Sequence, residues 1–348
     1  MKWLELANFL CGCSSNAIRN SATLVVGWKL DSIDVVKKSL NIAHRGGAGL
    51  KPENTLAAFA HALDLGVDGF ELDVHLAQDG TVVVFHDDAL KREIVRDVDG
   101  QWLDETGPLI KDLPYPALQN YDVGRLKPGS KYGARYPDQN PQDGERIPKL
   151  AEVIYMINRA GGSERLWIEL KSNFLERDQT SSPQAMAESV IRVLKREKFL
   201  DRTILVGFDW PALIAAKKLA PKVECWFTTL PQSWFGEEPP PPEHGPPPAA
   251  ELARLRSMEG GIAPWTGGFD RSQYGSIIKA AKAAGADGWF PYYADINRTT
   301  LNEARGLGLK IGAWTVNDMA DLARLADWGI DGICTDYPDR LGNVLKSL

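Results

Sequence analysis

The chain has 348 residues, of which 44% are hydrophobic and 25% are charged, and its formal net charge at pH 7 is −6. This composition is typical of a folded globular protein and excludes collagen-like, coiled-coil and disordered chains. The acidic balance argues against nucleic acid as the main partner. The four cysteines show neither a disulfide framework nor the spacing of a zinc site, which suits a reducing compartment.

Residues 1–40 precede the first strand pattern and are expected to form an N-terminal extension. Glu5 and Asn8 interrupt the apolar stretch that a signal peptide would need. No stretch approaches the about 18 consecutive apolar residues of a membrane-spanning helix. We therefore expect a cytoplasmic protein without a transmembrane segment. The Leu10-Cys11-Gly12-Cys13 sequence leaves a lipoprotein or exported form open, and a short N-terminal helix leaves open a weak contact with a membrane surface.

From residue 41 onward, short apolar runs alternate with amphipathic helical patterns, which predicts βαβ units and a parallel sheet. Eight such runs favour an α/β fold of the closed TIM (β/α)8 barrel type. A doubly wound open sheet is second, because no Gly-x-Gly-x-x-Gly turn follows the first run. The expected strands are 41–44, 69–75, 166–170, 203–208, 223–227, 288–291, 310–314 and 332–335. The expected helices are 56–65, 185–198, 210–219, 277–284, 300–307 and 319–328.

Two segments interrupt this alternation. Residues 87–148 are rich in Asp, Gly, Pro and Tyr and contain no strand–helix pair, which predicts an insertion subdomain after the second strand. Residues 231–250 contain two proline runs and are expected to form a stiff surface loop, with docking of a partner protein as the alternative.

Two carboxylates and an imidazole come together in the second strand and the hairpin that follows it. Glu71 and Asp73 are two residues apart on a strand, so their side chains project from the same face. The Asp79-Gly80 pair predicts a tight hairpin. With these two residues at the centre of the turn, Asp73 lies directly opposite His86. A turn that is one residue longer would shift this register.

The ends of the first and third strands add further polar side chains. His44 and Arg45 end the first strand, and Glu169 and Lys171 end the third. Because the carboxyl ends of the strands form one mouth of an α/β barrel, all of these groups are expected to meet there with Glu71.

This set of side chains suits cleavage of a phosphate ester. Three converging carboxylates repel one another unless a cation holds them, and oxygen ligands select Mg²⁺ or Ca²⁺. Arg45 and Lys171 beside such a cation would bind a phosphate-like oxyanion. Two imidazoles can supply a general base and a general acid near neutral pH. The residues therefore predict metal-assisted phosphoester cleavage.

Ordered motifs cover nearly all of the chain after residue 41. They are Ile42-Ala43-His44-Arg45-Gly46, Pro52-Glu53-Asn54-Thr55, Glu71-Leu72-Asp73-Val74, Asp79-Gly80, Phe85-His86-Asp87, Ile168-Glu169-Leu170-Lys171, Ala313-Trp314-Thr315-Val316-Asn317 and Gly332-Ile333-Cys334-Thr335-Asp336-Tyr337-Pro338. Together these motifs resemble the glycerophosphodiester phosphodiesterase family. The resemblance implies a TIM barrel with an insertion after the second strand, and residues 41–348 as the phosphodiesterase barrel. It also implies hydrolysis of glycerophosphodiesters to sn-glycerol 3-phosphate and an alcohol.

The resemblance also implies roles for individual residues. It makes His44 and His86 the acid/base pair. Its metal ligands are Glu71, Asp73 and Glu169, its phosphate contacts are Arg45 and Lys171, and Trp314 lies against the carbon portion of the substrate. The N-terminal forty residues and the proline-rich segment depart from the family pattern, which leaves substrate range and location open.

Other residues have competing interpretations. Pro52-Glu53-Asn54-Thr55 is expected to start a helix that Gly66 ends, with a secondary polar role for Glu53 near the site. Asp336 is expected to cap the last helix rather than to belong to the site. His61 and His75 are expected to be structural. Trp226, Trp289, Phe290 and Tyr292 either fill the barrel or line a substrate wall.

Two alternative functions remain open at this point. A hydrolase of the lysophospholipase D type would use the same residues on a lysophospholipid, with the insertion holding the acyl chain. A non-catalytic barrel would bind partners through its proline-rich loop, although the complete set of His44, His86 and three carboxylates argues against it.

Overall fold

The computed structural model describes residues 38–235, 249–259 and 263–348. Eight parallel strands follow one another around a closed barrel, which β1 completes by pairing with both β9 and β2. This confirms the predicted TIM barrel, and each expected strand is present within one residue at either end. The strands are β1 (Leu40–Ala43), β2 (Gly69–Leu76), β4 (Arg165–Leu170), β5 (Thr203–Gly207), β6 (Glu224–Thr228), β7 (Gly288–Phe290), β8 (Lys310–Ala313) and β9 (Gly332–Thr335).

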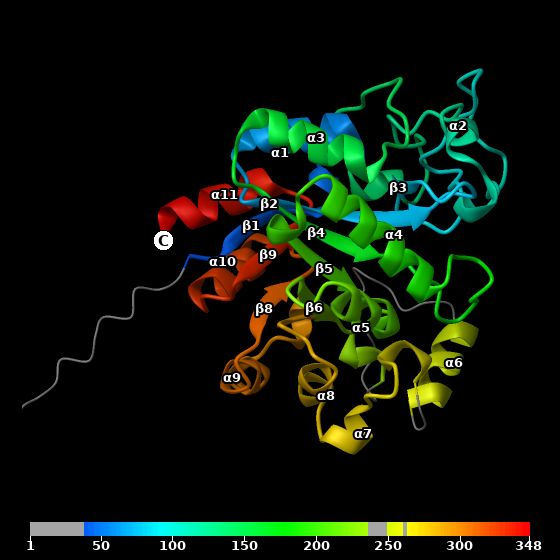
Figure 1. Ribbon diagram of the computed structural model, residues 1–348. Helices are drawn as coiled ribbons and strands as arrows, with labels where there is room; N and C mark the ends of the chain where they lie inside the picture. The colour runs from blue at the N-terminus through cyan, green and yellow to red at the C-terminus, as the bar shows by residue number, and fades with distance from the viewer. Residues whose placement is uncertain (1–37, 236–248, 260–262) are drawn as a thin grey trace, which may run out of the picture. The chain divides into compact units, whose positions relative to one another are not determined.

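Helices cover the outside of the barrel (Figure 1). The first begins as the sequence predicts, because the Thr55 side chain accepts a hydrogen bond from the Ala58 amide, and it ends at Gly66 in the left-handed region. The helices are α1 (Leu56–Leu65), α3 (Leu150–Ala160), α4 (Pro183–Arg196), α5 (Trp210–Leu219), α6 (Ala249–Glu259), α7 (Arg271–Tyr274), α8 (Ile277–Ala283), α9 (Arg298–Gly306), α10 (Met319–Asp327) and α11 (Pro338–Ser347).

Apolar side chains fill both layers of the barrel. Trp226 is fully buried in an interior cluster with Trp167 and Phe290, whereas Trp289 belongs to the larger cluster between strands and helices. The strands are buried on both faces, as parallel strands in this architecture must be. Trp226 therefore fills the barrel, and Phe290 is the member of the predicted aromatic group that also reaches the cavity at the strand ends.

The predicted register of the hairpin after β2 is wrong by one residue. Strand β3 (Val82–Val84) pairs antiparallel with β2, and Val74 lies opposite Val84. The turn contains three residues rather than two, because the Gly80 amide bonds back to the Ala77 carbonyl and Gly80 then takes φ +78°. Asp73 consequently lies opposite Phe85, whose amide donates to the Asp73 carbonyl at 3.0 Å.

The segment between β3 and α3 contains only short helices, among them α2 (Tyr115–Leu118). It has a hydrophobic cluster of its own, in which Leu90, Ile94 and Ile110 pack against Val83 and Phe85 of the hairpin. Figure 1 shows this segment beyond the arrowheads of β2 and β4, on the side of the barrel where the strands end. This segment therefore stands beside the mouth of the barrel.

No helix in the described ranges has the length and apolar character needed to cross a membrane. The predicted N-terminal extension lies almost wholly outside the described residues, and so does most of the proline-rich loop.

Candidate active site

A cavity of about 630 Å³ opens where the carboxyl ends of the barrel strands meet. Asp73 and Glu53 lie just outside its lining, each in contact with Arg45. Seven of the residues predicted from the sequence line the cavity: His44, Arg45, Glu71, His86, Glu169, Lys171 and Trp314. The structure thus brings the whole predicted set together around one space.

The three predicted metal ligands form a compact group. Glu71, Asp73 and Glu169 each offer one oxygen within 4.8 Å of the others. Burial and the neighbouring charges of Asp73 and Glu169 raise the pKa of Glu71 well above its ordinary value. Asp73 Oδ1 is buried without a hydrogen bond, although Lys171 Nζ lies 3.6 Å away. Such a set of hard, mutually repelling oxygens fits a divalent cation.

Cationic and amide groups surround the buried Asp73 carboxylate. Burial alone would raise the pKa of Asp73, but the charges of His86, Arg45 and Lys171 and the Asn54 amide lower it below its ordinary value. Asn54 Nδ2 donates to Asp73 Oδ2 at 2.9 Å. Lys171 Nζ donates to Glu169 Oε1 at 2.9 Å. Asp73 is therefore held as an anion, and Lys171 bridges it to Glu169.

The turn after β1 fixes Arg45 in the middle of the site. Arg45 has φ +51° and is followed by Gly46 with φ +83°. This bend lets the Arg45 amide donate to Glu71 Oε2 at 3.1 Å while the guanidinium Nη1 donates to Glu53 Oε1 at 2.8 Å. A Cβ on Gly46 would lie 2.8 Å from the Ala58 Cβ, so the turn can pack on α1 only with glycine there. Arg45 itself is held in the left-handed region, which is strained for a residue with a side chain, so this strain is built into the site.

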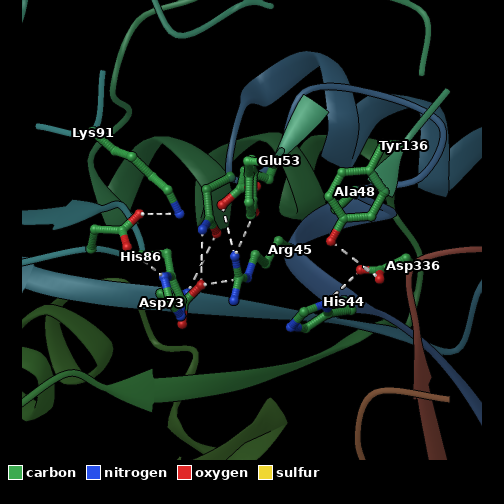
Figure 2. Close-up of polar contacts among 12 residues, drawn as sticks. His44, Arg45, Ala48, Glu53, Asp73, His86, Lys91, Tyr136 and Asp336 are labelled. Carbon is green, nitrogen blue, oxygen red and sulfur yellow. Dashed lines mark hydrogen bonds and ion pairs between the residues drawn. The ribbon is translucent and has the colours of Figure 1, made fainter. Parts of the chain in front are cut away.

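His44 is held by a carboxylate that the sequence analysis assigned to a helix cap. Nδ1 of His44 lies 2.6 Å from Oδ1 of Asp336, and Asn317 Nδ2 donates to Asp336 Oδ2 at 2.7 Å (Figure 2). Burial raises the pKa of Asp336, but His44 and Asn317 outweigh it and lower the value to about 2. The capping expectation was wrong, because α11 begins after Tyr337 with no side-chain cap. Asp336 belongs to the site.

His86 reaches the cavity even though the predicted register was wrong. It lies two residues beyond the end of β3, so the alternation of side chains along the strand no longer determines the face on which it lies. His86 Nδ1 lies 3.4 Å from Asp87 Oδ1, and its carbonyl accepts a hydrogen bond from Nε2 of buried His75 at 3.2 Å. Figure 2 shows His86 with Asp73 on one side of Arg45 and His44 with Asp336 on the other.

The family model for the glycerophosphoryl diester phosphodiesterase family matches residues 44–239 and 247–340 of this chain. The chain belongs to this family. A glycerophosphodiester phosphodiesterase from Caldanaerobacter subterraneus is 29% identical over 310 residues, which cover 89% of this chain and 98% of the relative. The matched regions include every predicted site residue.

Solved structures agree with the family assignment. A Silicibacter pomeroyi protein assigned to the same activity is 30% identical with a TM-score of 0.72, over 89% of this chain and 94% of its own. An Oleispira antarctica phosphodiesterase is 25% identical with a TM-score of 0.60, over 88% of this chain and 96% of its own. That second structure is a complex with the product sn-glycerol-3-phosphate.

In this phosphodiesterase the segment after β3 supplies a wall of the cavity that sequence reasoning missed. Its lining residues are Lys91, Tyr132, Arg135 and Tyr136. The Tyr132 hydroxyl donates to Glu53 and accepts from Arg45 Nη1, so this wall is tied directly to the central arginine. The only local signal was the aromatic and basic character of residues 131–136. The position of the segment after the second strand places it at the mouth of the barrel, but the sequence does not indicate which of its side chains reach the cavity.

The opposite wall of the phosphodiesterase cavity comes from the barrel and is mainly apolar. Trp314 Nε1 donates to the Phe290 carbonyl at 3.0 Å, and its ring meets Phe208 edge to face at 5.3 Å. Pro231 and Trp234 extend this wall. Trp314 therefore has a fixed orientation beside the polar groups.

Proposed function

We propose that this protein hydrolyses glycerophosphodiesters to sn-glycerol 3-phosphate and an alcohol, with Mg²⁺ or Ca²⁺ as its cation. One observation carries the proposal: two imidazoles, a three-carboxylate group and two partly buried cations surround the same cavity. The product complex of the Oleispira antarctica relative supports the choice of substrate class.

Glu71, Asp73 and Glu169 would hold the divalent cation. When bound, such a cation stabilises negative charge on phosphoryl oxygens as a Lewis acid. Burial and the charges of Asp73 and Glu169 raise the pKa of Glu71, and a cation among these carboxylates would offset both effects.

Arg45 and Lys171 would bind the phosphate oxygens. Arg45 is held from three sides, since its guanidinium contacts Glu53, Tyr132 and Asp73. Lys171 is held by Glu169 and Asp73. These contacts fix both cations before substrate arrives, so little side-chain order has to be gained on binding. Trp314 would pack against the carbon portion of the substrate.

His44 would act as general base and His86 as general acid. Asp336 is ionised and can only accept, so Nδ1 of His44 carries a proton, and in the neutral imidazole the lone pair therefore lies on Nε2. Nε2 can take the proton of the attacking oxygen, while Asp336 stabilises the imidazolium that forms. His86, on the other side of Arg45, would donate its own proton to the oxygen of the departing alcohol.

Turnover of glycerophosphocholine, followed by enzymatic detection of sn-glycerol 3-phosphate, tests this proposal. We expect hydrolysis of glycerophosphocholine in preference to lysophosphatidylcholine. Strong preference for the lysolipid would instead indicate a lysophospholipase D-like hydrolase that uses the apolar wall for an acyl chain. Failure to hydrolyse either compound in the presence of Mg²⁺ or Ca²⁺ would favour a non-catalytic barrel.

A further inference from the structure

The wall that residues 87–148 contribute to the cavity carries cations beyond the two that face the phosphate. Arg45 and Lys171 are buried against carboxylates of the barrel. Lys91 and Arg135 line the same cavity from the other side, and Arg135 is exposed to solvent. Two separate sets of positive charge therefore face one substrate space.

Aromatic rings hold these two outer cations in place. Lys91 Nζ lies 3.9 Å from the centre of the Tyr132 ring, and the Arg135 guanidinium carbon lies 5.5 Å from the same ring and 5.7 Å from that of Tyr136. The rings are themselves anchored, since the Tyr132 hydroxyl donates to Glu53 and the Tyr136 hydroxyl donates to Asp336 at 3.4 Å. Figure 2 shows Tyr136 directed at Asp336.

A cation held over a ring keeps its N–H donors available for an anion. Within the described part of the chain, no carboxylate lies in ion-pair range of Arg135, whereas Lys91 has Asp87 Oδ2 at 3.5 Å. Residues 123–137 contain four basic side chains between Asp122 and Asp138, and of these four only Arg125 has an ion pair among the described residues, with Asp143. The local field at this wall therefore favours negative charge.

The same contacts disfavour a quaternary ammonium group at this wall. Recognition of choline typically uses the open face of an aromatic ring. Lys91 and Arg135 already lie over the Tyr132 ring, and their charges would repel a further cation.

Lys91 pairs with Asp87, which also lies 3.4 Å from Nδ1 of His86, the proposed proton donor to the departing alcohol. We infer that the alcohol part of the substrate faces this wall, and that Lys91 and Arg135 form a subsite for an anionic group on that alcohol. Arg135 is its main determinant because its charge is not paired. This inference rests on the proposed function and specifies the alcohol: diesters whose alcohol carries a phosphate or a carboxylate are preferred over diesters of neutral or cationic alcohols.

The test compares kcat/KM for three diesters that share the glycerophosphate part: glycerophosphoinositol 4-phosphate, glycerophosphoinositol and glycerophosphocholine. The first two differ only in one phosphate group, so their ratio isolates the anionic subsite. We expect kcat/KM for glycerophosphoinositol 4-phosphate, whose alcohol is anionic, to exceed that for glycerophosphoinositol, whose alcohol is neutral, by about tenfold. Glycerophosphocholine, whose alcohol is cationic, should have the lowest kcat/KM of the three. Added salt should reduce the ratio by screening.

Arg135→Gln should bring the ratio of kcat/KM for glycerophosphoinositol 4-phosphate to that for glycerophosphoinositol close to one. Arg135→Lys, which retains the charge, should retain most of the preference. Lys127→Gln is the matched control, because it removes a charge from the same segment but lines a separate cavity of about 280 Å³. Arg135 is exposed, so these variants should fold, and thermal unfolding checks this.

Three results would overturn the inference. The first is a wild-type protein that does not prefer the anionic diester. The second is an Arg135→Gln variant that loses the same factor with all three substrates, which would assign the arginine to the shared phosphate. The third is a complete absence of turnover with every diester, which would overturn the proposed function together with the subsite. The first two results leave turnover in place and would overturn the subsite alone.

Discussion

Asp336 Oδ1 and His44 Nδ1 lie 2.6 Å apart although 292 residues separate them in the chain. Asn317 and Tyr136 satisfy the other carboxylate oxygen, so Asp336 is fixed from a barrel loop and from the segment after β3 at once. A carboxylate with its pKa lowered to about 2 is ionised throughout the neutral range. This pair therefore sets the tautomer of His44 as well as its direction.

Asp336→Asn should lower kcat by about 10²–10⁴-fold with little effect on KM, because the amide no longer enforces the reactive tautomer or stabilises an imidazolium. Steady-state kinetics measures the loss, and ¹⁵N chemical shifts of the His44 ring report the tautomer directly. Asp339→Asn makes the same chemical change in the first turn of α11 and serves as control. Equal losses in both variants would contradict a positioning role for Asp336.

Much of this site could be predicted because the position of a residue at the end of its own strand determines whether it reaches the mouth of the barrel. Polar residues at the carboxyl end of a barrel strand lie at the mouth, which is why His44 and Glu169 were expected to meet there. Glu71 joins them because β2 continues past the end of β1, whose pairing with β2 ends at Phe70. The hairpin register was not predictable with the same rule, since two- and three-residue turns share the Asp-Gly signal. Both place Gly80 in the left-handed region, and they differ in whether Asp79 also adopts it, which it does not here.

The role of Asp336 could not be predicted from the sequence for a different reason. An aspartate two residues before Pro338 has the features of a helix start, so local propensity favoured a cap. Its actual partners, His44 and Tyr136, are brought close only when the barrel closes and the long segment after β3 folds over its mouth. Contacts of this kind depend on the tertiary fold and leave no periodic pattern in the chain.

His86→Ala should reduce kcat by about 10²–10⁴-fold while the protein remains folded, because the variant lacks the proposed proton donor. His61→Ala is the matched control, since His61 lies on α1 and does not line the cavity. Circular dichroism and thermal unfolding check the fold of both variants. Unchanged activity in His86→Ala would remove this imidazole from the mechanism.

Chelation with EDTA should abolish activity, and Mg²⁺ or Ca²⁺ should restore it. Added cation should also raise the thermal unfolding temperature, because binding to the native state alone contributes about 2.7 kcal/mol at a hundredfold excess over Kd. Glu71→Gln should stabilise the metal-free protein by relieving repulsion and should remove the response to cation. Glu188→Gln, on the exposed face of α4, should change neither property. Full activity in EDTA would contradict the ligand assignment.

Gly46→Ala should destabilise the protein, since the left-handed backbone costs about 1–2 kcal/mol and the clash with the Ala58 Cβ adds about 1–3 kcal/mol. Gly129→Ala isolates the first contribution, because Gly129 has φ +72° but nothing within 4 Å of an added Cβ. Urea unfolding measures both variants. A loss in Gly46→Ala no larger than that in Gly129→Ala would show that the turn relaxes away from α1.

Asp295 should make stability depend on pH in the neutral range. Burial raises the pKa of Asp295 to about 6, and the Gln232 amide, which both carboxylate oxygens accept at 3.1–3.2 Å, opposes the rise only in part. The native state therefore binds a proton that the unfolded chain releases near pH 4, so the free energy of unfolding decreases as pH rises from about 4 to 7. The decrease attributable to this group is about 2 kcal/mol.

Asp295→Asn should remove that decrease while it keeps an acceptor for the Gln232 amide, which joins the loop after β6 to the loop after β7. Urea unfolding at pH 5 and pH 8 gives the comparison: the variant should be more stable than the wild type at the higher pH and similar to it at the lower. Parallel pH profiles for the two proteins would contradict the prediction and would mean that Asp295 ionises in the native state as easily as in the unfolded chain.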